Sequence, residues 1–536
     1  MKIHFNKNTL FLILLSLAMI AVTTLPYLWN YFERPIDTAY TWSGLYNPGD
    51  LPVYYSYIEQ TRQGRYAFID LFTGEIQTQR FFNIFWLAVG LMARWLNIAA
   101  PIAFQLARIL LIPLFIWTLK KTIDFFYPTK HWRILLTASL FVSGFGVLLM
   151  PFINRVNESQ ISVGLDLAAA EATPFTTMIF TGHFIFSWIC MLWSIMFTIK
   201  GFREQKFLPT ILAGLINLIF FQFHPYYAPF IFAFTFFVLV YNLIKKPQIK
   251  NLLLASLPVI ISLPSIFYYA YLWANDQRFY NFSQQNFTPT PAWWVVLLTF
   301  GFLSPLALAG IIILWRQKKW QENYTYLLFW LIIGNILLFM PFNTQRRFIE
   351  GLLIPTGIFA LIALKVLMNK IPIKLYNSFP KIFIQILLSV FFVIFFGFSS
   401  ILSYQLSFRL NYLAAKNLYL SQTANQTINW LKENTAISDL FLSPDDSTNI
   451  IAGLSGRQFY GWHLGETTYA PTKKRILESF FTTAFDTARI KFLKENRITK
   501  IYWSNESALQ YSFRPEEKNY LTKIYDNGDV KIYAVN

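Results

Sequence analysis

The sequence predicts a membrane protein of the all-α class, a polytopic bundle of about 11 transmembrane helices with outer juxtamembrane helices and a small C-terminal α/β extracytoplasmic domain. Three observations support this class, one on the whole chain, one on the first 404 residues and one on the remainder. The 536 residues are 55% hydrophobic and only 13% charged, whereas soluble proteins carry about 25% charged residues. Long apolar runs recur up to residue 404, and the chain then turns polar and mixed in charge.

Apolar runs of roughly 20 residues match the thickness of the hydrocarbon core of a bilayer. The eleven runs of this kind are 10–29, 102–119, 134–153, 178–199, 208–223, 230–244, 252–274, 293–315, 325–342, 351–369 and 382–404. The first run follows Lys2 and Lys7, as in a signal peptide, but no small-x-small cleavage site comes after it. We therefore expect it to be a retained first membrane helix.

The run 81–97 determines the orientation, because counting it as a crossing would invert every later loop. If it stays at the surface, 19 Lys and Arg fall in the N-terminus and one set of loops, and only Arg155, Arg278, Arg346 and Arg347 fall in the opposite short loops. Positive charge marks the cytoplasmic side. The pattern predicts a plasma-membrane protein with a cytoplasmic N-terminus, and an amphipathic helix at 81–96 lying in the outer interface.

Two domains are expected, a transmembrane domain at 1–404 with a long first outer loop at 30–101, and an exported α/β domain at 405–536. In the second domain, 423–434 and 473–485 have helical spacing. Short strands are indicated at 440–442 and 500–503, and a hairpin at 521–525 and 530–535 around Asn527-Gly528.

Several function classes are disfavoured. The net charge of +18 lies in short loops between apolar runs instead of along one face, which argues against a nucleic-acid partner. The single cysteine, Cys190, lies in an apolar run, so neither a disulfide framework nor a cysteine metal site is expected. No carboxylates or histidines have metal-ligand spacing, which favours metal-independent chemistry without settling the metal requirement. No glycine-rich phosphate loop is present, which disfavours a soluble nucleotide sugar.

The best candidate for a reaction centre is Asn47–Gly64, NPGDLPVYYSYIEQTRQG, in the first outer loop. Pro48-Gly49 predicts a turn before Asp50, and Pro52 favours the start of a helix directly after it. An acid at such a junction is held in position and is still exposed.

These residues resemble the acidic motif of the GT-C superfamily of integral-membrane glycosyltransferases, which includes protein mannosyltransferases and aminoarabinose transferases. The family pattern is Asp-Glu-x-x-Tyr followed by a helix and a Gly, and here Asp50-Leu-Pro-Val-Tyr54 and Gly64 are similar to it. Leu51 stands where the family often has its second acid, so Asp50 would act alone or with help from Asp37 or another loop.

Three further stretches extend the resemblance. Gln79-Arg80-Phe81 resembles the basic start of a juxtamembrane helix, although the two prolines of the family are absent. Phe104-Gln-Leu-Ala-Arg108 is similar to a Phe-x-x-Arg-Leu helix start, which would put Arg108 near the outer surface. Ala452–Trp462, AGLSGRQFYGW, resembles a segment of the exported domain in bacterial relatives.

The resemblance implies transfer of a sugar from a polyprenyl-phosphate donor to a glycan, lipid or protein acceptor at the outer face, with inversion. Asp50 would be the general base. Cationic groups would stabilise the departing phosphate. The residues expected to bind substrate are Tyr54, Arg80, Arg108, His224, Arg346 and Arg347, with Asp37 as the alternative acid.

Other readings stay open. The Arg346-Arg347 pair could contact lipid headgroups or pair with Glu350, and Asp166 and Glu171 are expected to be solvated loop or helix-capping residues. The main alternative function is a transporter or flippase for lipid-linked glycans, which should hold charged residues at mid-membrane. A glycan polymerase or ligase should instead carry its large loop late in the chain.

Overall fold

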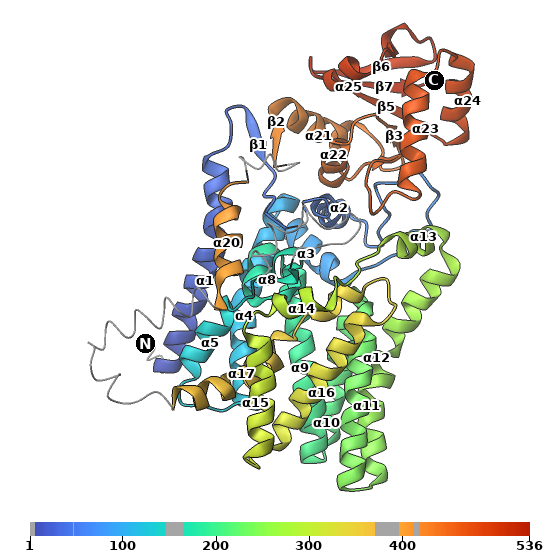
Figure 1. Cartoon of the computed structure of the whole chain (residues 1–536). Helices are drawn as coiled ribbons and strands as arrows, with labels where there is room; N and C mark the ends of the chain where they lie inside the picture. The colour runs from blue at the N-terminus through green and yellow to red at the C-terminus, as the bar shows by residue number, and fades with distance from the viewer. Residues whose placement is uncertain (1–5, 47, 146–163, 370–395, 411–417) are drawn as a thin grey trace, which may run out of the picture. The chain divides into compact units, whose positions relative to one another are not determined.

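The computed structural model describes residues 6–46, 48–145, 164–369, 396–410 and 418–536 (Figure 1). The chain forms two compact units. Unit 1 contains Met1–Pro26, Ala107–Tyr268 and Phe287–Phe408, and unit 2 contains Tyr27–Leu106, Tyr269–Asn286 and Arg409–Asn536. The first predicted outer loop and the C-terminal residues therefore belong to one unit. The division of the chain at residue 404 into membrane and exported parts stays a prediction.

Unit 1 is helical, as predicted. Seven helical segments within the described ranges are long and apolar enough to span a membrane, or eight if a bent pair counts as one span. The seven are Lys7–Phe32 (α1), Ala100–Phe126 (α4), Gly182–Glu204 (α9), Pro225–Lys245 (η3 and α11, Ala228–Lys245), Ile249–Asn275 (α12), Glu322–Phe339 (α16) and Gln345–Met368 (η4 and α17, Leu353–Met368). The chain is a multi-pass membrane protein.

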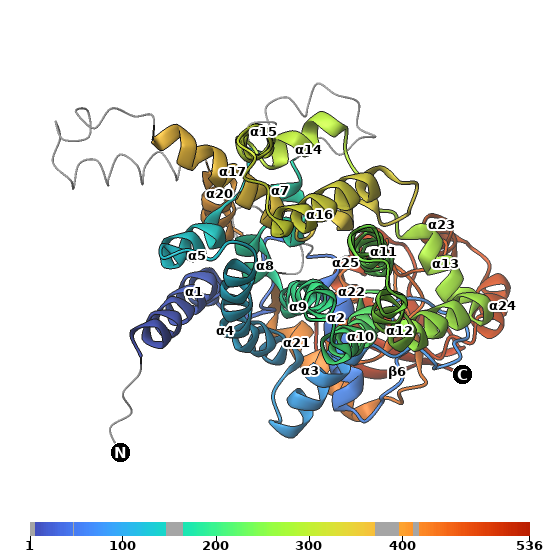
Figure 2. The same ribbon diagram turned by 90° about the horizontal axis from the view of Figure 1, so that it is seen from below.

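The helices of unit 1 pack as a bundle (Figure 2). Helix α9 lies against α10 (Phe207–Phe223) and α11, and α11 lies against α16. Helix α5 (Trp132–Phe141) and the short α7 (Leu165–Ala168) and α8 (Pro174–Phe180) are among the described elements that precede α9. The predicted runs 134–153 and 382–404 lie partly outside the described residues, and α20 (Phe398–Ser407) forms the end of the second run.

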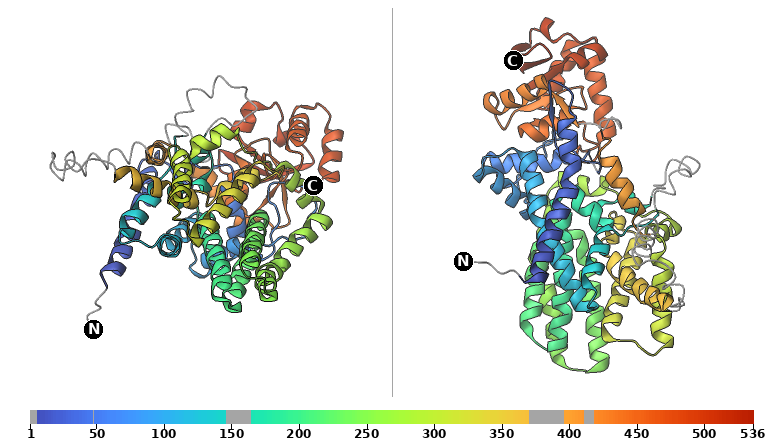
Figure 3. Two further views of the ribbon diagram at one scale, coloured as in Figure 1. Left: turned by 60° about the horizontal axis from the view of Figure 1, so that its bottom comes forward. Right: turned by 90° about the vertical axis from the view of Figure 1, so that its left-hand side faces the viewer.

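The predicted single run 293–315 is broken in the structure. It forms α14 (Trp293–Thr299) and α15 (Leu303–Arg316), which meet at an angle of 85°. Gly301 has φ +53°, a left-handed conformation that glycine adopts without steric cost, and it allows the sharp change of direction. Helix α15 then runs beside α17 (Figure 3). A Cβ at Gly310 would lie only 2.0 Å from the carbonyl oxygen of Phe359, so this close packing requires a glycine.

Unit 2 contains a five-stranded sheet in the order β4-β3-β5-β7-β6. Strands β3 (Leu440–Leu442), β4 (Gln458–Phe459) and β5 (Lys500–Ser504) are parallel, and β7 (Val530–Val535) and β6 (Leu521–Asp526) form an antiparallel hairpin. This confirms the predicted strands. Helices α23 (Ala470–Thr482) and α24 (Asp486–Glu495) contribute to the core of the sheet, where Phe481 and Trp503 are buried.

The helix that follows Asp50 is part of unit 2. Helix α2 (Leu51–Arg62) is buried along most of its length and packs against α3 (Ile84–Trp95) and α22 (Thr448–Ser455). A Cβ at Gly453 of α22 would approach the carbonyl oxygen of Pro52 to 2.4 Å, so the two helices touch at the backbone. Helix α3 has 12 residues, too few to cross a bilayer, in agreement with the predicted surface helix. Strands β1 (Thr38–Tyr40) and β2 (Tyr419–Ser421) pair antiparallel, and helix α21 (Gln422–Asn434) follows β2.

Candidate functional site

Asp50 occupies the N-cap position of α2, as the turn and Pro52 predicted. Its side chain makes no capping hydrogen bond, and the residue is half-buried. The N-terminus of a helix carries partial positive charge, which stabilises a carboxylate at this position by about 0.3–1 kcal/mol. The position therefore suits a general base, which acts as a carboxylate.

Tyr54 lies one turn along α2 from Asp50. Its ring stacks on Trp86 with ring centroids 4.7 Å apart, and on Phe104 at 6.2 Å. Aromatic stacking of this kind contributes about 0.5–1.5 kcal/mol beyond area burial. Since both neighbours are themselves buried, the Tyr54 ring braces α2 against α3 and the start of α4.

His463 connects the Asp50 turn to the C-terminal part of unit 2. Its Nδ1 accepts hydrogen bonds from the backbone N–H groups of Gly465 (3.2 Å) and Glu466 (3.0 Å), so Nδ1 carries no proton. Its Nε2 lies 2.8 Å from the carbonyl oxygen of Gly49, which can only accept. The partners therefore define the tautomer, with the proton on Nε2, and one imidazole holds both the residue before Asp50 and the backbone of Glu466.

Arg278 of α13 (Gln277–Gln285) forms a buried ion pair with Asp70. Its Nη2 and Nε lie 3.0 and 3.2 Å from the Oδ2 atom of Asp70, and Nη2 lies 3.6 Å from Glu466 Oε2. Burial opposes the charge of Arg278, but Asp70 and Glu466 together raise the pKa of its guanidinium. Burial first and Asp70 second raise the pKa of Glu466 to about 8, although Arg278 acts in the opposite direction.

Asp50 also acts electrostatically on Glu466, since its charge is among the causes that raise the pKa of the Glu466 carboxyl. Two nearby carboxyl groups do not both ionise readily, because their negative charges repel each other. Unit 2 thus contains one acid at a helix N-terminus, where the anion is stabilised, and a second acid whose burial favours the neutral form.

The segment Ala452–Trp462 supports helix α2, which carries Asp50 at its N-terminus. The guanidinium of Arg457 donates to Gln63 Oε1 (2.8 Å), to Thr435 Oγ1 (2.9 Å) and to the backbone of Lys432 (2.8 Å). Buried Arg457 therefore ties the C-terminal end of α2 to helix α21. The motif acts through structure, by supporting the helix that presents Asp50.

Arg80 and Asp37 lie on exposed parts of unit 2. Arg80 donates to the Tyr271 hydroxyl and lies 5.7 Å from the centroid of that ring. Asp37 precedes β1, has φ +60°, and its carbonyl oxygen accepts from the backbone N–H of Gln422 (2.9 Å). The backbone of Asp37 is thus used in joining β1 to the segment after β2, and its role as an alternative acid stays a prediction.

In unit 1, Arg347 pairs with Glu171 at 2.8 Å, and its guanidinium lies 5.3 Å from the centroid of the Phe184 ring. Of the two roles expected for Glu171, a solvated loop residue or a helix-capping residue, the first is wrong, because only 1% of this residue is exposed. Asp166 is also fully buried and accepts from the Gly144 N–H at 3.1 Å, so its predicted solvation is wrong for the same reason. Glu350, which the sequence offered as a partner of Arg346-Arg347, accepts a hydrogen bond from the Tyr227 hydroxyl.

The Tyr227 hydroxyl contacts Glu350 and also donates to the backbone oxygen of Arg347 (3.0 Å). Next to it, His224 follows α10 and is buried, with its ring centroid 5.2 Å from that of His183. Arg346 belongs to the same short helix, η4 (Gln345–Ile349), and its backbone N–H donates to Thr288 (3.1 Å). Unit 1 thus gathers His224 and Arg347, two of the predicted phosphate-binding residues.

Arg108 lies apart from these residues, fully buried in α4. It donates to the hydroxyls of Thr23 (3.0 Å) and Thr24 (3.0 Å) and to the carbonyl oxygen of Met178 (2.9 Å). These contacts join α1, α4 and α8. They explain how the charge is tolerated inside a helical bundle.

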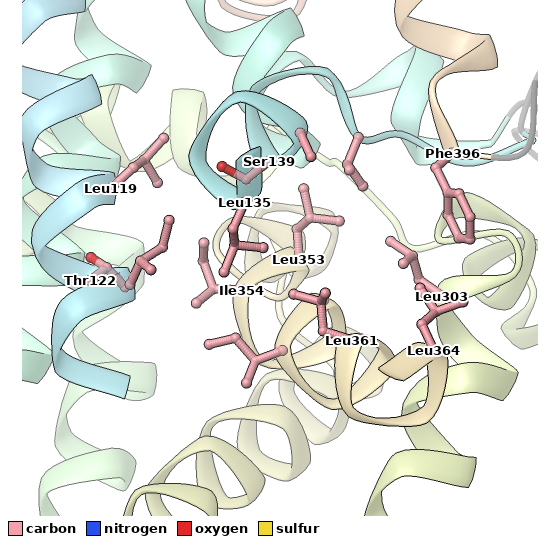
Figure 4. A pocket seen from close by; sticks show the side chains of 15 residues that line it. Leu119, Thr122, Leu135, Ser139, Leu303, Leu353, Ile354, Leu361, Leu364 and Phe396 are labelled. Carbon is pink, nitrogen blue, oxygen red and sulfur yellow. The ribbon is translucent and has the colours of Figure 1, made fainter. Parts of the chain in front are cut away.

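An apolar pocket of about 120 Å³ opens between α4, α5, α15 and α17 (Figure 4). Leucines from all four helices line it, and among the described lining residues the polar side chains are those of Thr122 and Ser139. A pocket of this character suits a hydrocarbon chain.

The carboxylates of Asp70 and Glu466 do not fit a divalent cation. Arg278 lies between the carboxylates of Asp70 and Glu466, so a metal ion bound there would meet a permanent positive charge. Within the ranges that the structure describes, no three His, Cys, Asp or Glu side chains gather closely enough to hold a metal. The metal requirement itself stays a prediction.

Glu466, Arg278, His463 and Glu171 were not predicted as site residues. Arg278 and Glu171 were noted only as loop charges. Glu466 and His463 directly follow the Gly461-Trp462 end of the recognised segment, so extending that segment by four residues would have included them.

Comparisons with known proteins agree with the fold. No family model and no curated protein sequence matches the chain. Among solved structures, the Archaeoglobus fulgidus oligosaccharyltransferase tethered to an acceptor peptide matches with a TM-score of 0.51 and 13% identity, over 97% of this chain and 74% of that chain. ArnT from Cupriavidus metallidurans bound to undecaprenyl phosphate matches with a TM-score of 0.52 and 10% identity, over 97% of each chain. The chain has the GT-C-like fold of these two proteins.

Proposed function

We propose that this protein transfers a sugar from a polyprenyl-phosphate donor to an acceptor at the outer face of the plasma membrane, with inversion at the anomeric carbon and with Asp50 as the general base. The observation that carries the proposal is the position of Asp50 at the N-terminus of α2, in a chain with a GT-C-like fold. The match to ArnT, solved with undecaprenyl phosphate, supports a lipid-linked donor.

The chemistry is a single displacement. The acceptor hydroxyl oxygen attacks the anomeric carbon, its proton passes to the Asp50 carboxylate, and the bond from the anomeric carbon to the phosphate oxygen breaks. The leaving phosphate keeps the bonding electron pair. A positioned base contributes about 10²–10⁴-fold to such a step. Attack on the face opposite to the leaving group inverts the anomeric configuration, which can be read from the product by NMR.

The leaving phosphate gains negative charge and requires cationic partners. Arg347 is the best candidate, because Glu171 holds its guanidinium in a defined orientation at 2.8 Å. Arg346 on the same short helix and His224 are proposed to assist it, as the sequence predicted. The roles predicted for Tyr54, Arg80 and Arg108 are better explained by their contacts within the protein.

The apolar pocket between α4, α5, α15 and α17 is proposed to receive part of the prenyl chain. Its wall is almost entirely hydrocarbon, and such a surface binds an isoprenoid through burial of apolar area, at about 25 cal/mol per Å². A bulky polar replacement such as Leu361→Gln is expected to raise the KM for a long-chain donor more than for a short-chain donor.

The orientation of the protein is part of the proposal. The positive charges of the 120–133 loop support a cytoplasmic position for that loop and an exported position for the C-terminus. A tag at position 125 is expected to be protected from reagents that label intact cells from outside. Labelling from outside would refute the proposed orientation.

The decisive experiment compares Asp50→Asn with Asp37→Asn in membranes supplied with undecaprenyl phosphate carrying a radiolabelled sugar. Asn keeps the size of the side chain but cannot take a proton. We expect Asp50→Asn to lose about 10²-fold or more of the transfer rate, and Asp37→Asn to retain it. Full transfer by folded Asp50→Asn would exclude this base, and loss confined to Asp37→Asn would assign the role to the alternative acid.

A flippase for lipid-linked glycans remains the second candidate, because unit 1 contains the pair of buried Glu171 with half-buried Arg347 and the bent pair α14–α15. Buried charges and broken helices are typical of transporters. Proteoliposomes distinguish the two functions. A flippase moves a fluorescent polyprenyl-phosphate lipid between leaflets without breaking its glycosidic bond, whereas a glycosyltransferase releases polyprenyl phosphate only when an acceptor is present.

A further inference from the structure

We propose that Glu466 is a second catalytic residue of this reaction, whose neutral carboxylic acid donates a hydrogen bond to the acceptor hydroxyl that Asp50 deprotonates. The inference rests on the proposed function. It assigns the acid that is absent at Leu51 to a position 415 residues after it in the chain, in the loop between β4 and α23.

The first argument is the shared attachment of the two acids. His463 accepts from the backbone N–H of Glu466 through Nδ1 and donates to the carbonyl oxygen of Gly49 through Nε2. Gly49 is bonded directly to Asp50. A rigid imidazole therefore defines the distance between the two backbones, and the arrangement does not depend on the side chains of either acid.

The second argument is the environment of the Glu466 carboxyl. It lies 3.6 Å from Arg278 Nη2, too far for a hydrogen bond, while Arg278 is engaged at 3.0 Å with Asp70. No other described residue donates to the Glu466 carboxyl. The side chain is 11% exposed, so it is shielded from bulk water but can still be reached. A carboxyl group that makes no hydrogen bond to the described residues can bind a substrate hydroxyl.

The third argument is its charge state. Five titratable groups face Glu466. They are Asp50 at the N-cap of α2, Tyr57 within α2, Asp70 in the loop after α2, Arg278 of α13 and His463 of the same loop as Glu466. Burial raises the pKa of the Glu466 carboxyl, and the negative charge of Asp70 raises it further. The positive charge of Arg278 lowers it, but Arg278 also pairs with Asp70 and does not cancel these effects, so the pKa of Glu466 is about 8. Glu466 is therefore mostly protonated at neutral pH and acts as a hydrogen-bond donor.

The two acids then have complementary roles. An acceptor hydroxyl donates its proton to Asp50 and accepts a hydrogen bond from the O–H of Glu466 through one lone pair, while its other lone pair attacks the anomeric carbon. The proton of Glu466 stays on Glu466. The residue fixes the orientation of the nucleophile, and orientation of this kind lowers the barrier by avoiding reorganisation in the transition state.

The test compares Glu466→Gln and Glu466→Leu with Glu495→Gln, a control at an exposed glutamate of α24. All three variants keep the backbone contact to His463. Gln provides an N–H donor and Leu provides none, so we expect Glu466→Gln to retain transfer at pH 7 within about threefold and Glu466→Leu to lose about 10²-fold in kcat. Wild-type activity is expected to fall as pH rises through about 8, and Glu466→Gln is expected to lack this alkaline decline.

The inference is overturned if folded Glu466→Leu transfers sugar as wild type does, or if Glu466→Gln shows the same alkaline decline as wild type. Thermal melting in detergent establishes folding, and if Glu466→Leu does not fold, the pH profile of Glu466→Gln decides alone. The proposed function fails separately, when wild type itself transfers no sugar from any polyprenyl-phosphate donor. In that case the role of Glu466 is refuted with it.

Discussion

The Nε2–H group of His463 donates a hydrogen bond to the carbonyl oxygen of Gly49 over 2.8 Å, across 414 residues of sequence. This bond joins the loop after β4 to the turn that carries the candidate base. Since Nδ1 of the same ring accepts two backbone N–H groups, the imidazole is held on both sides.

His463→Ala should therefore displace the Asp50 turn while leaving Asp50 in the protein. A misplacement of about 1 Å costs about 10²-fold in rate, so kcat should fall by 10–10²-fold. The KM for the lipid donor should change little, because His463 belongs to unit 2 and the proposed phosphate-binding residues belong to unit 1. The measurement is a steady-state titration of donor. A rise in KM alone, with kcat unchanged, would contradict the positioning role.

Arg347→Gln should lower kcat/KM for the donor by about 10–10²-fold, with a fall in kcat, since a charge-assisted hydrogen bond to the leaving phosphate contributes about 1.5–3 kcal/mol. The single variant also leaves Glu171 buried without its cation, which destabilises a protein by about 3–5 kcal/mol. The double variant Arg347→Gln/Glu171→Gln separates the two effects. It should regain much of the lost thermal stability and keep the low kcat/KM. Recovery of both quantities would limit Arg347 to a structural role.

Removal of divalent metal with EDTA should leave the transfer rate within about twofold of the untreated enzyme. The physical reason is the guanidinium of Arg278, which occupies the position between Asp70 and Glu466 that a cation would need. The assay is run after dialysis and again with added Mn²⁺ or Mg²⁺. Loss of activity that either metal restores would show that a metal takes part.

Glu466 should make the stability of unit 2 depend on pH. Its pKa of about 8 in the folded protein lies above the ordinary value for an unfolded chain, so the folded state binds the extra proton between these two values. Stability should then fall as pH rises through this window, by up to about 1.4 kcal/mol per pH unit, and level off above it. Glu466→Gln should melt at a higher temperature than wild type at pH 8.5, and equal melting temperatures would contradict the shift.

The sequence was sufficient for features that depend on local pattern. Apolar runs predicted the helices, the turn at Pro48-Gly49 and Pro52 predicted the start of α2, and β propensity with Asn527-Gly528 predicted the terminal hairpin. The break between α14 and α15 was missed, because Trp293–Arg316 is mostly apolar and long enough for a single span, although Gly301 and Pro305 lie near the break.

Features that depend on distant contacts could not be predicted in this way. Glu171 looks like a solvated acid because its partner, Arg347, is 176 residues away. Arg278 and Asp70 are separated by 208 residues, and neither has a neighbour in sequence that suggests an ion pair. The pairing of such charges is decided by which loops meet, and that information is absent from any short window of sequence.

The pairing of β1 with β2, at Thr38 and Ser421, has a consequence for biosynthesis. The ribosome completes Ser421 only after almost every apolar helix has been made. Strand β1 therefore cannot pair with β2, and α2 cannot pack against α22, until most of the chain has been synthesised. The segment with the candidate base is therefore finished last, although it is synthesised early. A chain that stops before the C-terminal residues is expected to enter the membrane and remain inactive, so a prematurely released chain would not carry out the reaction.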